Sequence, residues 1–340
     1  MFIPRGNDTY GNDEILSLFT IGNKLVTPSN HVYVIKKLIG NGIFGHVFKV
    51  VDPNTSQKYA LKVGQFGAAN NLIEKERNIY ATIENFPEAQ KINFGRMVDF
   101  FTHEGRFVII LEKYKMSLFK LLQNRKFQGF PLFYVSFMIK QICNAVSALT
   151  KNSIIHTDLK PENIMVTKDS VLKIIDFGSA ALNEDSIPEY SQSRHYRAPE
   201  IILGCERTFQ IDIWSIGCIA AELYLGLPIF AGTSALNMLQ LMELRLGKFP
   251  TIAFFDSPFI DNYFINNEVK KGPNGSVEDP ARFAIPKLKD LVFAIQFPNE
   301  TNEQKKVFCD FLSKVLEVDQ YERPTIDEVL LHPFLKMQPS

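Results

Sequence analysis

Two neighbouring runs carry most of the information in this 340-residue chain: His156-Thr157-Asp158-Leu159-Lys160-Pro161-Glu162-Asn163 and Lys173-Ile174-Ile175-Asp176-Phe177-Gly178. They place an acid, a cation, an amide and a second acid on two nearby loops. Phosphoryl transfer needs such a set, because the migrating group carries spread negative charge that the protein must position and neutralise. Solvated turns use the same residue types, and His-x-Asp alone would favour a turn. The presence of Asn163 and of Asp176-Phe177-Gly178 at this spacing favours catalysis instead.

The chemistry of these side chains suggests a role for each one. Asp158 can accept the proton of an incoming hydroxyl, and Lys160 can lie against the transferring phosphate. Asn163 and Asp176 offer the oxygen ligands that Mg²⁺ prefers. The pattern closely resembles the protein kinase superfamily, so these roles rest on that resemblance as much as on the chemistry.

Composition excludes several other classes of protein. The chain has 37 basic and 37 acidic side chains, so no global field favours nucleic acid or anionic lipid. Its four cysteines are scattered and form no C-x-x-C pair, which argues against zinc and disulfides and for a reducing compartment. We therefore expect an intracellular protein, cytoplasmic or nuclear, that binds neither nucleic acid nor membrane. The resemblance to protein kinases implies protein substrates, and we expect a monomer.

We expect no signal peptide and no membrane span. Arg5, Asp8 and Asp13 interrupt any early apolar region. The most apolar later segment, Ile211 to Phe230, contains two acids, Gly226 and Pro228, and is typical of a buried helix.

The resemblance implies a bilobal α+β fold. We expect a small antiparallel sheet with one helix over residues 31–112, and a larger, mainly helical lobe over 113–335, with an insert at about 247–300. Residues 1–30 form an N-terminal extension, and we expect it to pack on the domain because Leu16, Phe19 and Ile21 would be costly to expose. The kinase domain as a whole is expected over 31–335.

A glycine-rich segment lies between two predicted strands. G-x-G-x-x-G also occurs in dinucleotide-binding proteins, but there it joins a strand to a helix. Here it favours a phosphate-covering hairpin, in which Val47 can cover an adenine face. The expected ATP-binding residues are Gly40, Asn41, Gly42, Ile43, Phe44, Gly45, His46, Val47, Ala60, Lys62, Glu76, Glu112 and Tyr114.

The resemblance also gives roles to residues outside the glycine-rich segment. Lys62 can reach the α- and β-phosphates, and a helix from Asn71 to about Glu84 offers Glu76 as its partner, with Glu74 as the alternative. Glu112-Lys113-Tyr114 is expected to connect the lobes and to bond adenine through its backbone. The same resemblance assigns structural roles to Asp212, which braces the catalytic loop, and to a buried ion pair between Glu200 and Arg323.

The run Tyr190-Ser191-Gln192-Ser193-Arg194-His195-Tyr196-Arg197 resembles the dual-specificity tyrosine-regulated and homeodomain-interacting kinases, Yak-type members in particular. CDC-like kinases are the near alternative. Thr157 stands where most regulated kinases carry arginine, so other cations must order this loop. A phosphate on Tyr190 can bond both Arg194 and Arg197, although Tyr190 could also be an ordinary exposed tyrosine.

The sequence thus predicts an ATP- and Mg²⁺-dependent protein serine/threonine kinase that autophosphorylates Tyr190. Proline after the target residue fits the same group resemblance. The alternatives are a CDC-like kinase acting on splicing factors and a catalytically silent scaffold. The scaffold is disfavoured, because Lys62, Asp158, Asn163 and Asp176 are all present.

Overall fold

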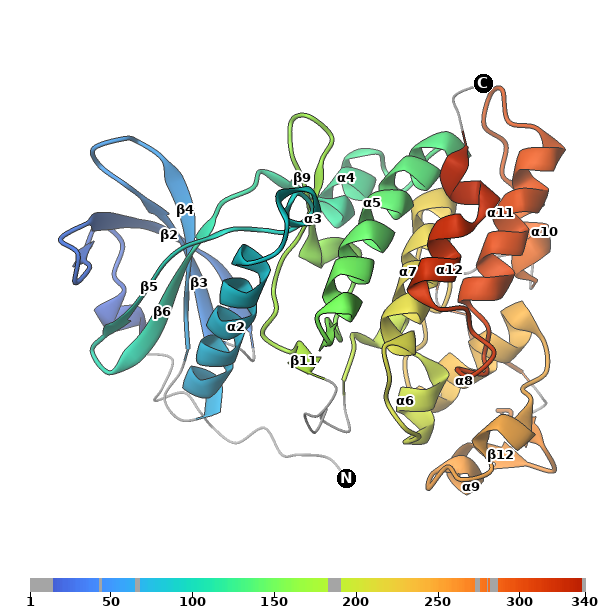
Figure 1. Ribbon diagram of the computed structural model, residues 1–340. Coiled ribbons are helices and arrows are strands. Elements are labelled where there is room, and N and C mark those ends of the chain that lie inside the picture. The colour runs from blue at the N-terminus through green and yellow to red at the C-terminus, as the bar shows by residue number, and fades with distance from the viewer. Residues whose placement is uncertain are drawn as a thin grey trace. The chain divides into compact units, whose positions relative to one another are not determined.

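The computed structural model describes residues 15–42, 45–64, 68–182, 191–272, 276–279, 281 and 287–337 (Figure 1). The chain forms two compact units. The first comprises Met1–Lys115 and Ile175–Ser179, and the second comprises Met116–Ile174 and Ala180–Ser340. The predicted two-lobed α+β fold is confirmed. The first unit ends after Lys115 rather than after Glu112, and it also includes the segment that carries Asp176.

The first unit is built on a six-stranded antiparallel sheet with strand order β1-β2-β3-β4-β6-β5. Its strands are β1 (Lys24–Val26), β2 (Val32–Gly42), β3 (Gly45–Val51), β4 (Lys58–Val63), β5 (Met97–His103) and β6 (Arg106–Glu112). Its helices are α2 (Ala68–Glu84) and the short α3 (Glu88–Lys91). A hairpin at Glu104-Gly105 joins β5 to β6. Glu104 and Gly105 both have left-handed φ angles, of 48° and 71°, as a tight two-residue hairpin loop requires.

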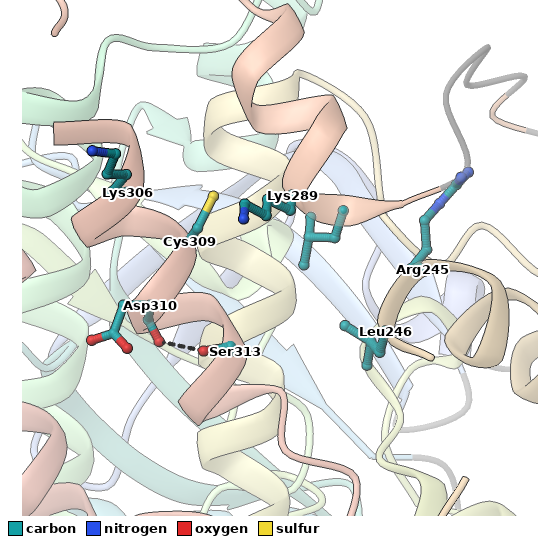
Figure 2. A pocket seen from close by; sticks show the side chains of 8 residues that line it. Arg245, Leu246, Lys289, Lys306, Cys309, Asp310 and Ser313 are labelled. Atoms are coloured by element: carbon teal, nitrogen blue, oxygen red, sulfur yellow. Dashed lines mark hydrogen bonds between the residues drawn. The ribbon is translucent and has the colours of Figure 1, made fainter. Parts of the chain in front are cut away.

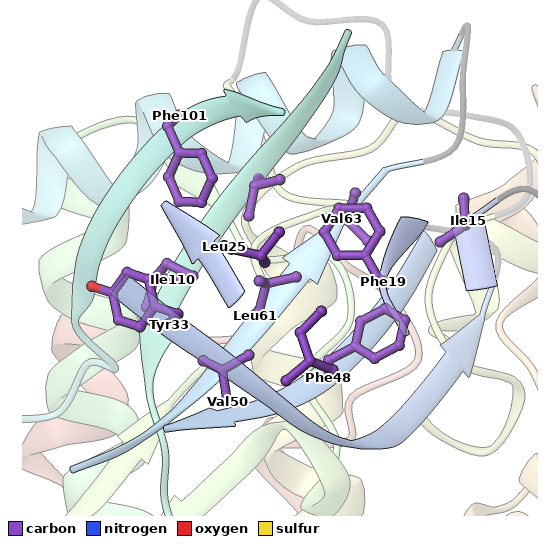
Figure 3. Close-up of a cluster of buried hydrophobic side chains, with 12 residues drawn as sticks. Ile15, Phe19, Leu25, Tyr33, Phe48, Val50, Leu61, Val63, Phe101 and Ile110 are labelled. Carbon is purple, nitrogen blue, oxygen red and sulfur yellow. The ribbon is translucent and has the colours of Figure 1, made fainter. Parts of the chain in front are cut away.

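The two faces of this sheet carry different side chains, because successive strand residues point to opposite faces. Leu61 and Val63 lie in a buried apolar cluster, while Lys62 between them points to the face on which α2 packs. The N-terminal segment contributes Ile15 and Phe19 to the cluster, and Phe19 stacks on Phe48 (Figure 3). The other members are Leu25, Tyr33, Ile35, Val50, Phe101, Val108 and Ile110.

The N-terminal extension therefore packs on the sheet, but only in part as predicted. Phe19 is 1% exposed, whereas Leu16 is 42% and Ile21 is 66% exposed. The expectation that all three would be buried is wrong for Leu16 and Ile21. Ile15 and Phe19 are four residues apart on one helical turn and share the face that meets the sheet, and Leu16 lies on the other side.

The second unit is mainly helical, and α7 (Gln210–Leu225) lies at its centre. Every residue of α7 from Ile211 onward is buried, and α5 (Leu132–Lys151) and α11 (Asn302–Val315) pack on it (Figure 1). By length and composition α5 could cross a membrane, but 67% of its most apolar window is buried inside the protein. Helices in the core of a folded protein can be equally long and apolar.

The remaining elements of the second unit are short. The strands are β7 (Met116–Ser117), β8 (Ile154–Ile155), β9 (Ile164–Val166), β10 (Leu172–Ile174), β11 (Ala181–Leu182), β12 (Phe264–Ile265) and β13 (Glu268–Val269). The helices are α4 (Leu118–Asn124), α6 (Pro199–Leu203), α8 (Ala235–Leu246), α9 (Ile260–Tyr263), α10 (Leu288–Ala294) and α12 (Ile326–Leu331). The single 3₁₀ turns are η1 (Pro161–Asn163), η2 (Arg194–Tyr196), η3 (Thr251–Phe254) and η5 (Pro333–Lys336).

Helix starts in the second unit follow the local sequence. Thr301 with Gln304 and Thr325 with Glu328 form reciprocal capping boxes at the starts of α11 and α12. The predicted insert contains η3, α9, the β12–β13 hairpin and α10 within its described residues.

A buried ion pair ties α6 to the segment before α12. Arg323 Nη1 donates to Glu200 Oε1 at 2.8 Å, and Nη2 donates to Oε2 at 3.1 Å. Both side chains are fully buried. The Arg323 guanidinium also bonds the carbonyls of Glu317 and Gln210 and lies 5.2 Å from the Trp214 ring centroid. These contacts satisfy the buried charges, which makes the pair a structural element.

Candidate functional site

Asp212 holds the loop that carries Asp158. Its carboxylate accepts the backbone N–H of His156 at 2.7 Å and that of Thr157 at 3.0 Å. Burial raises the pKa of Asp212, while the electrostatic interaction with the neighbouring His156 and these two hydrogen bonds oppose the rise. Thr157 has a left-handed φ of 64°, which costs a β-branched residue about 1–3 kcal/mol. The Asp212 contacts keep the loop in this strained form.

The second unit brings three polar residues together around Asp158. We call Asp158, Lys160, Asn163 and Ser193 the Asp158 cluster. Lys160 Nζ donates to Asp158 Oδ2 at 2.6 Å and to Ser193 Oγ at 2.8 Å. The backbone N–H of Ser193 donates to Asp158 Oδ1 at 2.9 Å. The carboxylate is therefore fixed from both sides, and its side chain is 12% exposed.

Asn163 completes the cluster in a way that suits a metal ligand. Its Nδ2 donates to the Asp158 carbonyl at 3.0 Å and lies 3.3 Å from Asp158 Oδ2. The carbonyl oxygen Oδ1 is therefore the atom that can ligate a cation. Asp176 in the first unit keeps 31% of its side chain exposed. The amide oxygen of Asn163 and the carboxylate of Asp176 each have the oxygen chemistry that Mg²⁺ prefers. That they bind one metal ion together stays a prediction.

The first unit contains a second polar cluster, formed by Lys62, Glu76 and Asp176. Lys62 Nζ donates to Glu76 Oε2 at 2.6 Å and to Asp176 Oδ1 at 2.7 Å. Burial alone would lower the pKa of Lys62, but the two carboxylates outweigh it and raise the pKa. Glu76 is the carboxylate that pairs with Lys62, and Glu74 lies on the exposed side of α2. We call these three residues the Lys62 cluster.

An aromatic contact fixes the segment that carries Asp176. Asp176 has a left-handed φ of 68°. The next residue, Phe177, is buried and meets the Tyr80 ring edge-on at a centroid distance of 5.0 Å, with Phe94 at 6.2 Å. Tyr80 is four residues after Glu76, so one side of α2 provides both contacts. Sequence reasoning assigned Tyr80 no role, although the run Glu-x-x-x-Tyr marked its position.

The glycine-rich segment is the hairpin of β2 and β3, and Ile43 and Phe44 at its tip lie outside the described residues. Gly40 is the Cα partner of Val47, Asn41 of His46 and Gly42 of Gly45. A Cβ on Gly45, whose φ is 119°, would lie 2.0 Å from the Val63 carbonyl oxygen. Glycine at 45 is therefore required by the close approach of β3 to β4, whatever the hairpin binds.

His46 does not face the predicted nucleotide. Its side chain is 1% exposed and stacks on Phe48, in the face of the sheet that carries the apolar cluster. Strand alternation explains the position of this side chain, because Val47 is the Cα partner of Lys62 and points to the opposite face with it. Binding of ATP at His46 stays a prediction. Ala60 is two residues before Lys62 and shares that face. Only the backbone of His46 remains available to a phosphate.

The segment Glu112-Lys113-Tyr114, which was predicted to connect the lobes, begins inside the sheet. Glu112 is the last residue of β6, and its N–H donates to the Arg96 carbonyl at 2.9 Å. Its side chain accepts the Tyr114 hydroxyl at 2.9 Å. Because the Glu112 N–H is occupied, the backbone of Tyr114 is the better-placed donor for a base.

The segment around Tyr190 can be described only in part, because Tyr190 lies outside the described residues. Arg194 is exposed, whereas Arg197 is 5% exposed and donates to the carbonyls of Ser191 and Gln192 at 2.8 and 2.7 Å. The predicted binding of phosphotyrosine by Arg194 and Arg197 stays a prediction. The described contacts give Arg197 a structural role in addition.

A buried pair anchors the end of this segment to α7. The Tyr196 hydroxyl donates to Glu222 Oε2 at 2.7 Å, and both residues are at most 5% exposed. Burial raises the pKa of Glu222 to about 8. Glu222 is therefore mainly protonated at neutral pH, which removes the cost of a buried charge beside Tyr196.

A separate cavity of about 360 Å³ lies between α8, α10 and α11 (Figure 2). Lys289 and Lys306 are at its rim, and Leu246 and Cys309 line it. Burial raises the pKa of the Cys309 thiol to about 11, so it is protonated at neutral pH. No member of the Asp158 cluster lines this cavity.

Comparison with known proteins agrees with the geometry. A family model described as "Protein kinase domain" matches residues 33–335. The chain is 32% identical to serine/threonine-protein kinase ppk15 of Schizosaccharomyces pombe, over 97% of this chain and 66% of that protein. It is 30% identical to dual specificity protein kinase YAK1 of Saccharomyces cerevisiae, over 98% of this chain and 45% of that protein.

A mammalian relative gives a similar match. The chain is 33% identical to dual specificity tyrosine-phosphorylation-regulated kinase 3 of Mus musculus, over 92% of this chain and 56% of that protein. The chain thus spans between about half and two thirds of the length of these three relatives. The resemblance predicted from the run Tyr190 to Arg197 is confirmed.

Proposed function

Because the chain belongs to the protein kinase family, with relatives of the Yak and tyrosine-regulated type, we propose that it transfers the γ-phosphoryl group of ATP to protein serine and threonine hydroxyls and to its own Tyr190. The observation that carries this proposal is the Asp158 cluster. It presents a fixed, partly accessible carboxylate beside an ammonium group, as in-line phosphoryl transfer to an alcohol requires.

Asp158 acts as the proton acceptor for the substrate hydroxyl. The Ser193 N–H and the Lys160 ammonium hold the two carboxylate oxygens, so the acid does not have to reorient during the reaction. Lys160 is 22% exposed and can also contact the transferring phosphoryl group, whose charge it neutralises. Asn163 orients Asp158 through its side-chain amide.

The Lys62 cluster acts on the nucleotide. Glu76 holds the Lys62 ammonium in one position, where it can pair with the α- and β-phosphates. Bound Mg²⁺ supplies further neutralisation of the phosphate charge, and Asn163 and Asp176 are the residues that would hold it. Val47 and Ala60, on the same sheet face as Lys62, provide the apolar surface for the base.

Preference for proline after the target residue belongs to the same proposal. Ser193 contacts Asp158, so a substrate segment with its hydroxyl at Asp158 passes the neighbouring Gln192. The Gln192 carbonyl already accepts Arg197 Nη2. A substrate residue with a backbone N–H would then lose a hydrogen-bond acceptor, at a cost of about 1–3 kcal/mol. Proline has no such N–H to satisfy.

The experiment that tests the proposed function is label transfer from [γ-³²P]ATP to matched peptides. The purified chain should label serine and threonine peptides in a Mg²⁺-dependent reaction and should leave a tyrosine peptide of the same flanking sequence nearly unlabelled. The rate should lie in the range of about 1–100 per second that is usual for kinases. ATP hydrolysis without peptide labelling would contradict the proposal.

A further inference from the structure

Four lysines cross the sheet of the first unit in one row. Lys37 is on β2, Lys49 on β3, Lys58 at the start of β4 and Lys113 directly after β6, and these four strands are consecutive in the sheet (Figure 1). Lys37 is the Cα partner of Lys49, so their side chains lie side by side on one face. Lys58 is two positions before the Cα partner of Lys49 and lies diagonally next to it. We call these four residues the lysine row.

The lysine row shares its face with Lys62 but lies away from it. Lys58 and Lys62 are four residues apart on β4, so strand alternation points both to the same face. Four strand residues span about 13 Å. Ala60, which was assigned to the surface for the base, lies between them. The row is therefore separate from the Lys62 cluster, to which the nucleotide phosphates are assigned.

Among the residues that the structure describes, no acid pairs with the lysine row. Lys113 Nζ donates to the neutral carbonyl of Tyr114 at 3.1 Å. Of the acids close by in sequence, Asp52 accepts hydrogen bonds within its own turn, and Glu112 accepts the Tyr114 hydroxyl. The positive charge of the row is therefore left unbalanced by the described part of the chain.

The ammonium groups of the row act on one another. Burial lowers the pKa of Lys113, and the charges of Lys49 and Lys58 lower it further. Like charges directly opposite each other on neighbouring strands, such as those of Lys37 and Lys49, destabilise a sheet. The whole chain carries no net charge, so this concentration of positive charge is local. A bound anion would remove the repulsion.

We propose that the lysine row binds an extended acidic segment of a partner protein. The row crosses three strand spacings and is about 14 Å long. An extended segment presents side chains on one side about every 6.7 Å, so three acidic residues at alternate positions match the row. Their charges offset the repulsion among the lysines and steer the two proteins together.

The surroundings of the row favour an acidic peptide over other anions. Val51 is the Cα partner of both Val34 and Lys58, so these two side chains beside the row are aliphatic. Proteins that bind single-stranded nucleic acid usually add aromatic side chains on which the bases stack. A lone phosphate would contact one end of the row and leave the other lysines unbalanced.

Fluorescence anisotropy with the full chain tests the proposal without any phosphoryl transfer. The probe is a fluorescein-labelled peptide with three glutamates at alternate positions and glutamine between them, in about 50 mM salt. Lys37→Gln combined with Lys58→Gln should weaken its binding about fivefold, because each exposed ion pair contributes a modest amount. Both lysines are exposed, so the double variant should keep the wild-type melting temperature. An unchanged dissociation constant in this variant would overturn the proposal.

The matched control is Lys140→Gln combined with Lys168→Gln. Both lysines are exposed in the second unit, on α5 and in the turn between β9 and β10, and the change in net charge is the same. The dissociation constant should stay at the wild-type value. Equal weakening in the two double variants would mean that the peptide responds to the overall charge of the chain, and the lysine row would then be no site.

Two further ligands identify the site and the partner. Saturating MgATP should leave peptide binding unchanged, and displacement of the peptide would place it on the Lys62 cluster and contradict the proposal. A fluorescein-labelled oligothymidine with three phosphates should bind more weakly than the peptide. Tighter binding of the oligothymidine would replace the acidic peptide by single-stranded nucleic acid as the partner. None of these measurements needs kinase activity, so a failed labelling reaction and a failed docking site are separate results.

Discussion

Asp158→Asn should lower kcat for a serine peptide by about 10²–10⁴-fold while the protein still folds and binds ATP. The amide has nearly the same size as the carboxylate and can still accept the Ser193 N–H through its oxygen. It cannot accept the substrate proton. ATP affinity should change little, because the nucleotide phosphates are assigned to the Lys62 cluster rather than to Asp158. The measurements are kcat, the ATP dissociation constant and the melting temperature.

Asp169→Asn is the matched control for that variant. Asp169 is exposed, lies in the turn between β9 and β10 and belongs to the same unit. The Asp169→Asn substitution makes the same chemical change outside the Asp158 cluster, so kcat should stay at the wild-type value. A normal kcat in Asp158→Asn would remove Asp158 from the reaction, and a large loss of ATP affinity would mean that the two clusters are not assigned correctly.

Glu200→Ala should lower the free energy of unfolding by about 3–5 kcal/mol, the largest stability effect expected of any single charge removal here. Both side chains of the Glu200–Arg323 pair are fully buried. Truncating Glu200 leaves the Arg323 guanidinium in the interior without its carboxylate partner, and the carbonyls of Glu317 and Gln210 cannot balance its charge. Urea unfolding of the full chain, followed by far-UV circular dichroism, measures the loss.

Glu268→Ala is the control for this stability prediction. Glu268 pairs with Lys248 at 2.8 Å, but the two side chains are 50% and 79% exposed. Solvent screens such a pair, so its loss should have a much smaller effect than the loss of the buried one. Equal effects of Glu200→Ala and Glu268→Ala would show that the Glu200–Arg323 pair is not buried in solution.

The catalytic residues could be predicted because each motif is local. Asp158, Lys160 and Asn163 lie within six positions of one another, and the type and spacing of their side chains already match the chemistry. The Lys62–Glu76 pair needed one further step, the recognition that a helix follows the strand of Lys62. The fold class followed from the same motifs, since they imply a sheet-bearing unit and a helical unit.

Two contacts between distant segments could not be predicted. Ser193 reaches Asp158 across 35 positions, and the Gln192 side chain reaches α7 across 19 and 23 positions. Neither residue has a distinctive side chain or spacing, so only the folded chain reveals the contact. The run that contains Gln192 and Ser193 was recognised, but it was recognised by its tyrosine and arginines.

The structure refines two expectations that treated a segment as uniform. His46 was grouped with its glycine-rich neighbours, although strand alternation places its side chain on the face opposite Val47. Leu16 was grouped with Phe19, although the helical turn presents Ile15 and Phe19 to the sheet and leaves Leu16 on its other side. In both cases the periodicity was present in the sequence and would have given the right face.

The most direct test that this chain transfers phosphate through Asp158 is the phosphorylation state of Tyr190 after bacterial expression. Intact mass followed by peptide mapping should find one phosphate on Tyr190 in the wild-type chain and none in Asp158→Asn. A wild-type chain without phosphate on Tyr190, or an Asp158→Asn chain that carries it, would contradict this claim.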